Sequence, residues 1–537
     1  MIAALALAAI FIAQVSMAQD ICMAPAKTES GLLKGAAETT TKTCVWRGVP
    51  FAAAPVGDLR WKAPAPAKSW SGVREASSWG HRCMQTGLME RMNADPSGGM
   101  SEDCLYLNIW RPSKPGKFPV MVWIHGGGYT GGTASTPMYW GDRMSEAGGV
   151  VVVSFNYRLN VFGFLSLPAL ASEDPNKSTG NYGSLDQVAA LKWVHDNIAN
   201  FGGDPDTVTI FGESAGGQSV YTLVASPLAK GLFQRAIVES GRSNASLSLE
   251  RGYAEGKAIS EKFGCKADDL ACLRKIPAQK ILDAAAAGLQ ESVFEPHHDG
   301  YFLENTPRAM ISSGKYNRVP ILAGSNKNEI NVMLAFRRDL RNTRPADYDK
   351  KIQELLEISE PEALKFSSAY PLAKYGDLPL NAFGQMATDF RMGCPTYQGL
   401  AAASKFQGEL YYYRFDYHDI LLGDYIGAVH SLEIPFVFNS MDRPPMKTLL
   451  KKENMNEMTK LSSTMQGYWV NFAKIGNPNG PGIPDWPGFE LNSQTVMVFD
   501  QSVRAMASGI AERCALWDDY SKNHPGKIDI LSKPKKK

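Results

Sequence analysis

The chain has 537 residues, 44% of them hydrophobic and 20% charged, a composition that is typical of folded globular proteins and excludes a disordered one. Its 56 Lys and Arg residues against 54 Asp and Glu residues leave a net charge of +2. This balance argues against a nucleic-acid-binding protein, which is held by phosphate contacts. No repeat or Pro/Ser-rich linker divides the chain, so we expect one large domain over residues 19–522.

The two ends of the chain differ from this domain. An apolar stretch up to about Val15 is too short to span a bilayer, and Ser16 and Ala18 supply a small-x-small cleavage pattern. We therefore expect residues 1–18 to be a signal peptide of a secreted or periplasmic protein that keeps no integral membrane segment. Because the usual basic n-region is missing, a buried N-terminal helix is the alternative. Residues 523–537, which end in KPKKK, predict a basic disordered tail.

Eight cysteines agree with export, because even numbers favour disulfides in an oxidising compartment. Eight thiols allow about 105 pairings, so the sequence alone selects none of them. Pairing each cysteine with its nearest neighbour suggests Cys22–Cys44, Cys83–Cys104, Cys265–Cys272 and Cys394–Cys514. No Cys-x-x-Cys is present, which argues against zinc or redox chemistry.

Apolar runs alternate with helical patterns along the chain. Four runs have the composition of strands buried on both faces: Phe118–His125, Gly149–Leu159, Asp206–Gly212 and Gln234–Gly241. A helical pattern between the second and third runs ends at Gly202 and Gly203. This order predicts an α/β fold, a large and mostly parallel twisted sheet with helices on both faces. Two more strands are expected at Arg318–Gly324 and Glu409–Phe415, and residues 342–369 are predicted to be helical.

The stretch TIFGESAGGQSV, from Thr209 to Val220, contains a G-x-S-x-G pattern centred on Ser214. The pattern is short and frequent by chance, and an ordinary serine in a glycine-rich loop is the alternative. Its context favours a nucleophile, because TVTIF supplies a strand before it and the helix closed by Pro227 follows it. In that setting a sharp strand-to-helix turn exposes the serine hydroxyl.

A second glycine-rich stretch, WIHGGGYTGG (Trp123–Gly132), directly follows a predicted strand. Glycines there allow backbone N–H groups to converge on one point, and the HGGG pattern is the known partner of a serine elbow. A flexible turn is the alternative. The presence of both patterns in the expected order favours an oxyanion hole.

The motifs above do not identify the base or the acid of such a site. Histidines that follow the serine qualify in the order Ser…acid…His, and there are five: His297, His298, His418, His430 and His524. His524 lies in the polar tail, and the adjacent His297 and His298 have no second ligand cluster that would suggest a metal. Spacing does not separate His418 from His430. The candidate acids are Asp299, Glu329 and Glu433.

Several long motifs, in order, resemble the type-B carboxylesterase/lipase (cholinesterase-like) family of the α/β-hydrolase fold. They are EDCLYLNIW, HGGG, NYRL, DQVAALKWVHDNIANFGGDP, VTIFGESAGG and YWVNFAKIGNPNGPGIPDWPGF, and the resemblance covers roughly Thr41 to Trp517. It implies a serine esterase that hydrolyses small-molecule carboxylic esters without a cofactor or metal.

The resemblance also implies roles for individual residues. The family's acid lies in a Gly-x-Asn-Lys-x-Glu pattern, here GSNKNE, and its histidine precedes a run that here is EIPFVF. Ser214 is then the nucleophile, His430 the general base and then acid, and Glu329 the orienting carboxylate. The implied oxyanion donors are the N–H groups of Gly127, Gly128 and Ala215. Three cysteine pairs are also supported, whereas Cys22–Cys44 is outside the common family set.

Some positions depart from the family pattern. Cholinesterases carry a tryptophan in the first disulfide loop, where it binds quaternary ammonium, and the span between Cys83 and Cys104 has none. A choline ester is therefore not expected as the preferred substrate. Ser431 stands where many relatives have glycine, a change that we expect to be tolerated. Substrate-pocket residues are expected by resemblance at Phe294, His297, His298, Val332 and Met333.

Two rival functions remain. An inactive cholinesterase-like adhesion ectodomain typically lacks the serine or the histidine, and all three triad positions are filled here. An interfacial lipase needs an apolar lid, and the Cys83–Cys104 span contains several methionines but also charges. For the esterase, the ordinary pKa of histidine predicts that activity declines near or below about pH 6.5.

Overall fold

The computed structural model describes residues 21–86, 95–288, 294–334 and 336–524. The expected signal peptide lies outside these residues, as does the expected tail from residue 525 onward. Within the described ranges, no helix combines the length and apolarity needed to cross a bilayer. The last described helix, α21 (Ala511–Asn523), stops where the basic tail is predicted to start.

An eleven-stranded sheet forms the centre of the described structure. Its seven middle strands are parallel in the order β10, β9, β11, β12, β15, β16, β17, and antiparallel strands close both edges. The strands are β3 (Ala36–Ala37), β4 (Thr43–Pro50), β8 (Tyr106–Pro112), β9 (Phe118–Ile124), β10 (Val151–Phe155), β11 (Gly203–Glu213), β12 (Arg235–Glu239), β15 (Ile321–Asn326), β16 (Leu410–Phe415), β17 (Thr495–Phe499) and β18 (Arg504–Ala507). The expected α/β fold with a mostly parallel sheet is confirmed.

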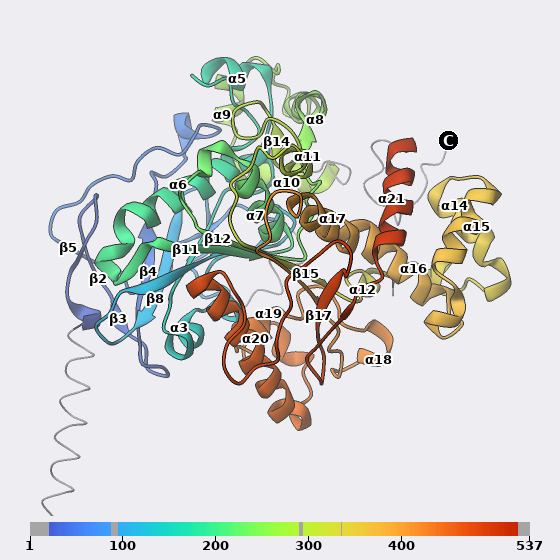
Figure 1. Cartoon of the computed structure of the whole chain (residues 1–537). Helices are drawn as coiled ribbons and strands as arrows, with labels where there is room; N and C mark the ends of the chain where they lie inside the picture. The colour runs from blue at the N-terminus through green and yellow to red at the C-terminus, as the bar shows by residue number, and fades with distance from the viewer. Residues whose placement is uncertain (1–20, 87–94, 289–293, 335, 525–537) are drawn as a thin grey trace, which may run out of the picture.

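Helices cover both faces of the sheet, which explains the continuous apolar strands. In Figure 1, α6 (Tyr182–Asn197) and α7 (Ala215–Ala225) lie on one face, and α3 (Asp142–Gly148) and α20 (Met455–Ile475) lie on the other. Alternate side chains of β9 enter separate cores, Val122 facing α6 and α7, and Trp123 facing α3 and α20. The six predicted strands correspond to β9, β10, β11, β12, β15 and β16.

The predicted helical stretch over residues 342–369 forms two helices, α14 (Tyr348–Leu356) and α15 (Glu360–Ala369). Glu357 ends the first in the left-handed region, at φ 59°, and Ser359 caps the second with Glu362 in a capping box. The change of backbone direction at Glu357 separates the two helices. Apolar periodicity alone does not predict such a break.

All four predicted disulfides are present: Cys22–Cys44, Cys83–Cys104, Cys265–Cys272 and Cys394–Cys514. No described cysteine is left free. Four disulfides are consistent with an extracellular or periplasmic protein, because thiols are kept reduced in the cytosol.

The last residue of β12, Glu239, places a carboxyl group in the core beneath the serine turn. Its Oε1 accepts a hydrogen bond from Trp469 Nε1 of α20 at 2.8 Å, and its Oε2 has no partner among the described residues. Burial, with a smaller effect of the Glu213 charge, raises the pKa of Glu239 to about 8. The native state therefore retains a proton that the unfolded chain loses above about pH 4.5.

We expect Glu239→Gln to gain stability relative to the wild type as pH rises from about 5 to about 8. Over that window the unfolded wild-type chain ionises while native Glu239 stays protonated, so wild-type stability falls by on the order of a few kcal/mol. Glutamine keeps the Oε1 acceptor and does not titrate. Thermal unfolding of both proteins across this range tests the expectation, and a constant difference in Tm would contradict it.

Candidate active site

Ser214 occupies a turn of one residue between β11, which ends at Glu213, and α7, which begins at Ala215. Its backbone has φ 57° and ψ −120°, a conformation that is strained for a residue with a side chain. The Ser214 N–H donates to the carbonyl oxygen of Glu239 on β12 at 2.9 Å. The strained turn therefore stands at the carboxyl edge of the sheet, as the G-x-S-x-G pattern predicts.

The glycines of this turn are required by close packing against β9. A Cβ atom on Gly216 would lie 1.9 Å from the carbonyl oxygen of Ile124, and one on Gly212 would lie 2.6 Å from the same oxygen. Both distances are shorter than any real contact. Only glycine permits the strand, the turn and the helix to approach β9 this closely.

The glycine-rich loop after β9 lies directly beside Ser214. A Cβ atom on Gly126 would be 3.1 Å from the Ser214 Cβ. Gly127 and Gly128 have φ 109° and 61°, and their N–H groups donate to no other described residue. The N–H of Ala215, first in α7, has no acceptor within its own helix. The loop and the helix thus offer backbone donors next to the serine.

The His430 ring contacts the carboxylate of Glu329, with 2.5 Å between Nδ1 and Oε2. Glu329 follows β15, and its Oε1 accepts hydrogen bonds from Ser240 Oγ at 2.6 Å and from the Asn326 N–H at 2.7 Å. His430 lies in the loop between α18 (Gly423–Ile426) and α19 (Ile434–Val437). The carboxylate is held at both oxygens and fixes the orientation of the ring.

The other candidate residues make different contacts. Among the five histidines after Ser214, all of them described, only His430 contacts a carboxylate. His418 Nδ1 donates to the Asp416 carbonyl oxygen, and His524 Nδ1 donates to that of Tyr520. Asp299 accepts backbone N–H groups of its own loop. The carboxylate contact thus distinguishes His430 from His418, which spacing along the chain did not separate.

Glu213, which the sequence reasoning did not single out, faces the other side of the ring. Its Oε1 lies 3.2 Å from His430 Nε2 and accepts the Ser431 hydroxyl at 2.7 Å. Ser214 Oγ makes no hydrogen bond to the ring in this structure, although both residues are described. The sequence held one sign of this contact, because Glu213 places a carboxylic acid directly before the serine in the G-x-S-x-G pattern.

The two carboxylates shift the pKa of the His430 imidazole. Burial lowers the pKa of His430, but Glu213 and Glu329 outweigh burial and raise it above the ordinary 6.5. We therefore expect esterase activity to decline, on the acidic side, at a pH above 6.5 and not near or below it. Burial in turn raises the pKa of Glu213.

Comparison with known proteins shows the family of this chain. Residues 24–517 match the model of the carboxylesterase family. The chain belongs to that family. Para-nitrobenzyl esterase of Bacillus subtilis is 36% identical over 484 residues, which cover 89% of this chain and 94% of that protein. Liver carboxylesterase of Sus scrofa is 37% identical, with 88% of each chain covered.

A solved structure titled PNB esterase superposes on this carboxylesterase with a TM-score of 0.78 and 35% identity, covering 92% of this chain and all of that one. The expected family and α/β-hydrolase fold are confirmed. The chain is a carboxylic ester hydrolase, and small-molecule esters are its class of substrate.

The expected pocket residues of the carboxylesterase occupy different environments. Val332 and Met333 lie on α12 (Asn331–Leu334), directly after Glu329, with 41% and 52% of their surface exposed. Phe294 is buried, and residues 289–293 before it are outside the described ranges. His298 is half-buried, with Nδ1 3.3 Å from Ser246 Oγ. The pocket therefore remains a prediction at these positions.

His297 has a different environment from the exposed α12 residues. Its Nδ1 donates to the Gly180 carbonyl oxygen at 3.0 Å, and a Cβ atom on Gly252 would lie 2.3 Å from its Nε2. Burial lowers the pKa of His297 to about 4, so the ring is neutral at physiological pH. This enclosure favours a core position for the ring.

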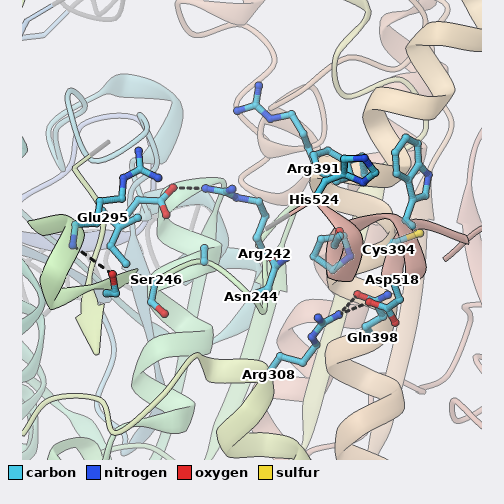
Figure 2. A pocket seen from close by; sticks show the side chains of 18 residues that line it. Arg242, Asn244, Ser246, Glu295, Arg308, Arg391, Cys394, Gln398, Asp518 and His524 are labelled. Carbon is cyan, nitrogen blue, oxygen red and sulfur yellow. Dashed lines mark hydrogen bonds and ion pairs between the residues drawn. The ribbon is translucent and has the colours of Figure 1, made fainter. Parts of the chain in front are cut away.

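A cavity of about 310 Å³ elsewhere in the esterase is lined by several arginines but not by Ser214, Glu329 or His430. Arg242 pairs with Glu295, and Arg308 pairs with Asp518 at 3.0 Å. Figure 2 shows these two arginines directed to carboxylates on opposite sides of the view. The guanidinium groups do not converge, so the cavity is no second active-site candidate. In the described ranges, no three His, Cys, Asp or Glu side chains form a metal site.

We expect the acidic limb of the kcat/KM profile to lie above pH 6.5 in the wild type and to move to lower pH in Glu213→Gln. The histidine must be unprotonated to act as a base, and the Glu213 charge stabilises its protonated form. Initial rates on a soluble aryl ester from about pH 5 to about pH 9 measure the limb. An unchanged limb in Glu213→Gln would contradict the assignment of this contact.

Ser431→Gly provides a milder version of the same test. The Ser431 hydroxyl donates to Glu213 and favours its ionised form, while its backbone at φ 67° suits glycine. Loss of the hydroxyl is expected to move the limb in the same direction by a smaller amount. A shift toward higher pH would be inconsistent with this reasoning.

Proposed function

We propose that this carboxylesterase is an exported serine esterase that forms an acyl-enzyme on Ser214, with His430 and Glu329 completing a triad. The observation that carries the proposal is the 2.5 Å contact between His430 Nδ1 and Glu329 Oε2, at the sheet edge where the turn presents Ser214. This is the base-and-orienter geometry that serine hydrolases require.

The first step is transfer of the Ser214 proton to His430 Nε2. A serine hydroxyl is a weak nucleophile until an adjacent imidazole accepts its proton. Glu329 holds the N–H on Nδ1, which leaves Nε2 as the acceptor, and offsets the charge of the imidazolium that forms. Nε2 has to exchange Glu213 for Ser214 as its neighbour, and catalytic hydrogen bonds often tighten only when substrate binds.

Attack of Ser214 on the ester carbonyl forms a tetrahedral oxyanion. The N–H groups of Gly127, Gly128 and Ala215 are proposed to donate hydrogen bonds to this oxyanion. Two observations support this role: Ala215 follows Ser214 in the chain, and a Cβ atom on the neighbouring Gly126 would lie 3.1 Å from the Ser214 Cβ. His430 then protonates the leaving alcohol, and an acyl-Ser214 remains. Water activated by His430 releases the acid and restores the free hydroxyl. The serine proton thus leaves with the alcohol, and a proton taken from water replaces it on Ser214, so the enzyme is restored after one cycle.

We also propose that residues 1–18 are a signal peptide, that residues 19–522 form one domain, and that residues 523–537 are a basic tail. Four disulfides support passage through an oxidising compartment. An eleven-stranded sheet that draws strands from residue 36 to residue 507 supports a single domain.

A second candidate, hydrolysis of esters at a lipid surface, is favoured by exposed apolar side chains next to both triad loops. These side chains follow Glu329 or precede His430 in the chain: Val332, Met333, Phe336, Leu421, Leu422 and Tyr425. Contiguous exposed apolar surface is typical of interaction sites. Rates on emulsified triglycerides and on soluble short esters, compared at equal enzyme concentration, separate the two. A preference for emulsions would favour the lipase.

We expect Ser214→Ala to lower kcat on a short-chain aryl ester by about 10³-fold or more and to leave Tm unchanged. The variant is also expected to lose covalent labelling by a fluorophosphonate, because no hydroxyl remains to be phosphonylated. Ser226→Ala, the same change at the other end of α7, is the matched control and is expected to retain activity and labelling. Retention of most hydrolysis by Ser214→Ala would refute the nucleophile.

A further inference from the structure

The side chain of Gln85 bonds to the glycine-rich loop from a separate part of the chain. Gln85 follows Cys83 of the first disulfide loop, and only 1% of its surface is exposed. Its Oε1 accepts the Gly132 N–H at 3.0 Å, and its Nε2 donates to the Gly132 carbonyl oxygen at 3.1 Å and to that of Cys83 at 3.0 Å. The amide thus pairs with both backbone groups of Gly132, as a neighbouring strand would.

Gly132 is in close contact with the part of the loop that carries the proposed oxyanion donors. A Cβ atom on Gly132 would lie 2.4 Å from the Gly126 carbonyl oxygen, and one on Gly127 would lie 2.2 Å from that of Gly131. The Gly127 carbonyl oxygen also accepts the N–H groups of Thr130 and Gly131, both at 3.1 Å. The loop is therefore closed on itself, and a shift of Gly132 displaces Gly126 and Gly127.

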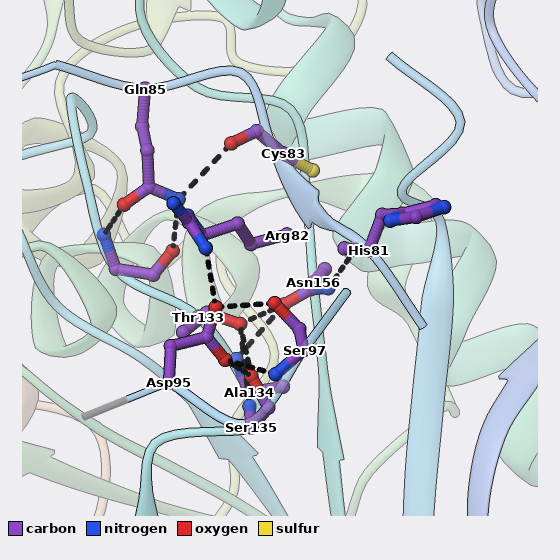
Figure 3. Close-up of polar contacts among 11 residues, drawn as sticks. His81, Arg82, Cys83, Gln85, Asp95, Ser97, Thr133, Ala134, Ser135 and Asn156 are labelled. Atoms are coloured by element: carbon purple, nitrogen blue, oxygen red, sulfur yellow. Dashed lines mark hydrogen bonds and ion pairs between the residues drawn. The ribbon is translucent and has the colours of Figure 1, made fainter. Parts of the chain in front are cut away.

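The segment after Gly132 has separate anchors. Asn156 Oδ1 accepts the Ala134 N–H at 2.9 Å, and Asp95 accepts the Ser135 hydroxyl (Figure 3). The loop also receives hydrogen bonds away from Gly132: the Tyr157 hydroxyl donates to the His125 carbonyl oxygen at 2.9 Å, and the Ser219 hydroxyl donates to the Tyr129 hydroxyl at 3.2 Å. Two backbone groups contribute as well, the Thr86 N–H to the Thr130 carbonyl oxygen and the Asn160 N–H to the Tyr129 carbonyl oxygen. Gln85 is thus placed to control the loop at the residue that supports the donors.

We propose that Gln85 is a positioning residue for the oxyanion hole, because it holds Gly132 and thereby aims the N–H groups of Gly127 and Gly128 at the carbonyl attacked by Ser214. The inference rests on the proposed role of Ser214. Fixed donors stabilise the oxyanion without reorganisation at the moment of reaction, whereas a loose loop has to be ordered first. The loss of Gln85 therefore reduces binding of the transition state more than binding of the ester.

Gln85→Met tests the proposal, since it keeps the length of the side chain and removes the three hydrogen bonds. We expect kcat on a short aryl ester to fall about 10- to 100-fold, somewhat less than for removal of a donor, with KM changed less than about threefold. Affinity for an aryl trifluoromethyl ketone is expected to fall by a similar factor, because Ser214 adds to its carbonyl carbon and creates an oxyanion. The pH of the acidic limb is expected to stay unchanged, because the His430 contacts are untouched.

Gln85→Glu is the conservative variant, and it also serves if Gln85→Met does not fold. It keeps an acceptor for the Gly132 N–H but loses the donors to the Gly132 and Cys83 carbonyl oxygens, so a loss of kcat and of inhibitor affinity is expected that is largest where the carboxylate is ionised. Protonation of the introduced carboxylate restores one donor. The fold-loss relative to the wild type, measured at each pH, is therefore expected to diminish as pH falls.

The matched control is Ser135→Ala, which removes the bond to Asp95 three residues beyond Gly132. It is expected to lower Tm while kcat and ketone affinity stay at wild-type values. If Gln85→Met lowers Tm but leaves kcat and ketone affinity unchanged, Gln85 is only structural and the proposal is overturned. Two other results would show instead that Ser214 is not the nucleophile. They are a wild-type enzyme that the ketone does not inhibit, and a Ser214→Ala variant that remains active.

Discussion

The close approach of three backbone segments at the carbonyl oxygen of Ile124 is the constraint on which the site depends. That oxygen occupies the space that a side chain on Gly212 or Gly216 would need, so both positions have to be glycine. With the strand and the helix this close, the connecting turn has room for one residue, and Ser214 takes the strained conformation at φ 57°. The same packing places the glycine loop after β9 against the Ser214 side chain.

Burial determines the electrostatics around this turn. Four glutamates, Glu213, Glu239, Glu329 and Glu433, lie in the interior, and His430 is the imidazole in contact with two of them. Burial raises the pKa of Glu213, Glu239 and Glu433, whereas the neighbouring carboxylates raise that of His430. The site therefore favours a protonated imidazole, which is the form that follows proton transfer from a serine.

A second layer of polar contacts supports the backbone donors. Gln85 and Asn156 are buried side chains that bond to the backbone of Gly132 and of Ala134, in the loop and in the segment after it. A loop rich in glycine has more conformational freedom to lose than other loops, so its order has to come from such contacts. The first disulfide loop, which supplies Gln85, thus takes part in shaping the site that lies beside Ser214.

Much of this architecture follows from local sequence patterns. The six apolar runs predict strands of the sheet because a strand covered on both faces needs a continuous apolar run, and the two glycine-rich motifs predict the turn and the loop because close backbone approach needs glycine. The antiparallel strand β8 was recognised only as part of a family motif, since its place in the sheet depends on pairing with β4 and β10. Cys22–Cys44 was suggested by nearest-neighbour pairing alone, without support from the family pattern, and the structure contains it.

What the sequence by itself determined is six strands of the central sheet and the residue types at the serine turn, because apolar runs and glycine spacing are local properties. Only the tertiary structure decided which side chains meet. Glu329 and His430 are 101 positions apart and Gln85 and Gly132 are 47 apart, so their contacts depend on the order of strands and on loops that cross the edge of the sheet. Spacing along a chain carries no information about such pairs, and for that reason spacing alone did not separate His418 from His430.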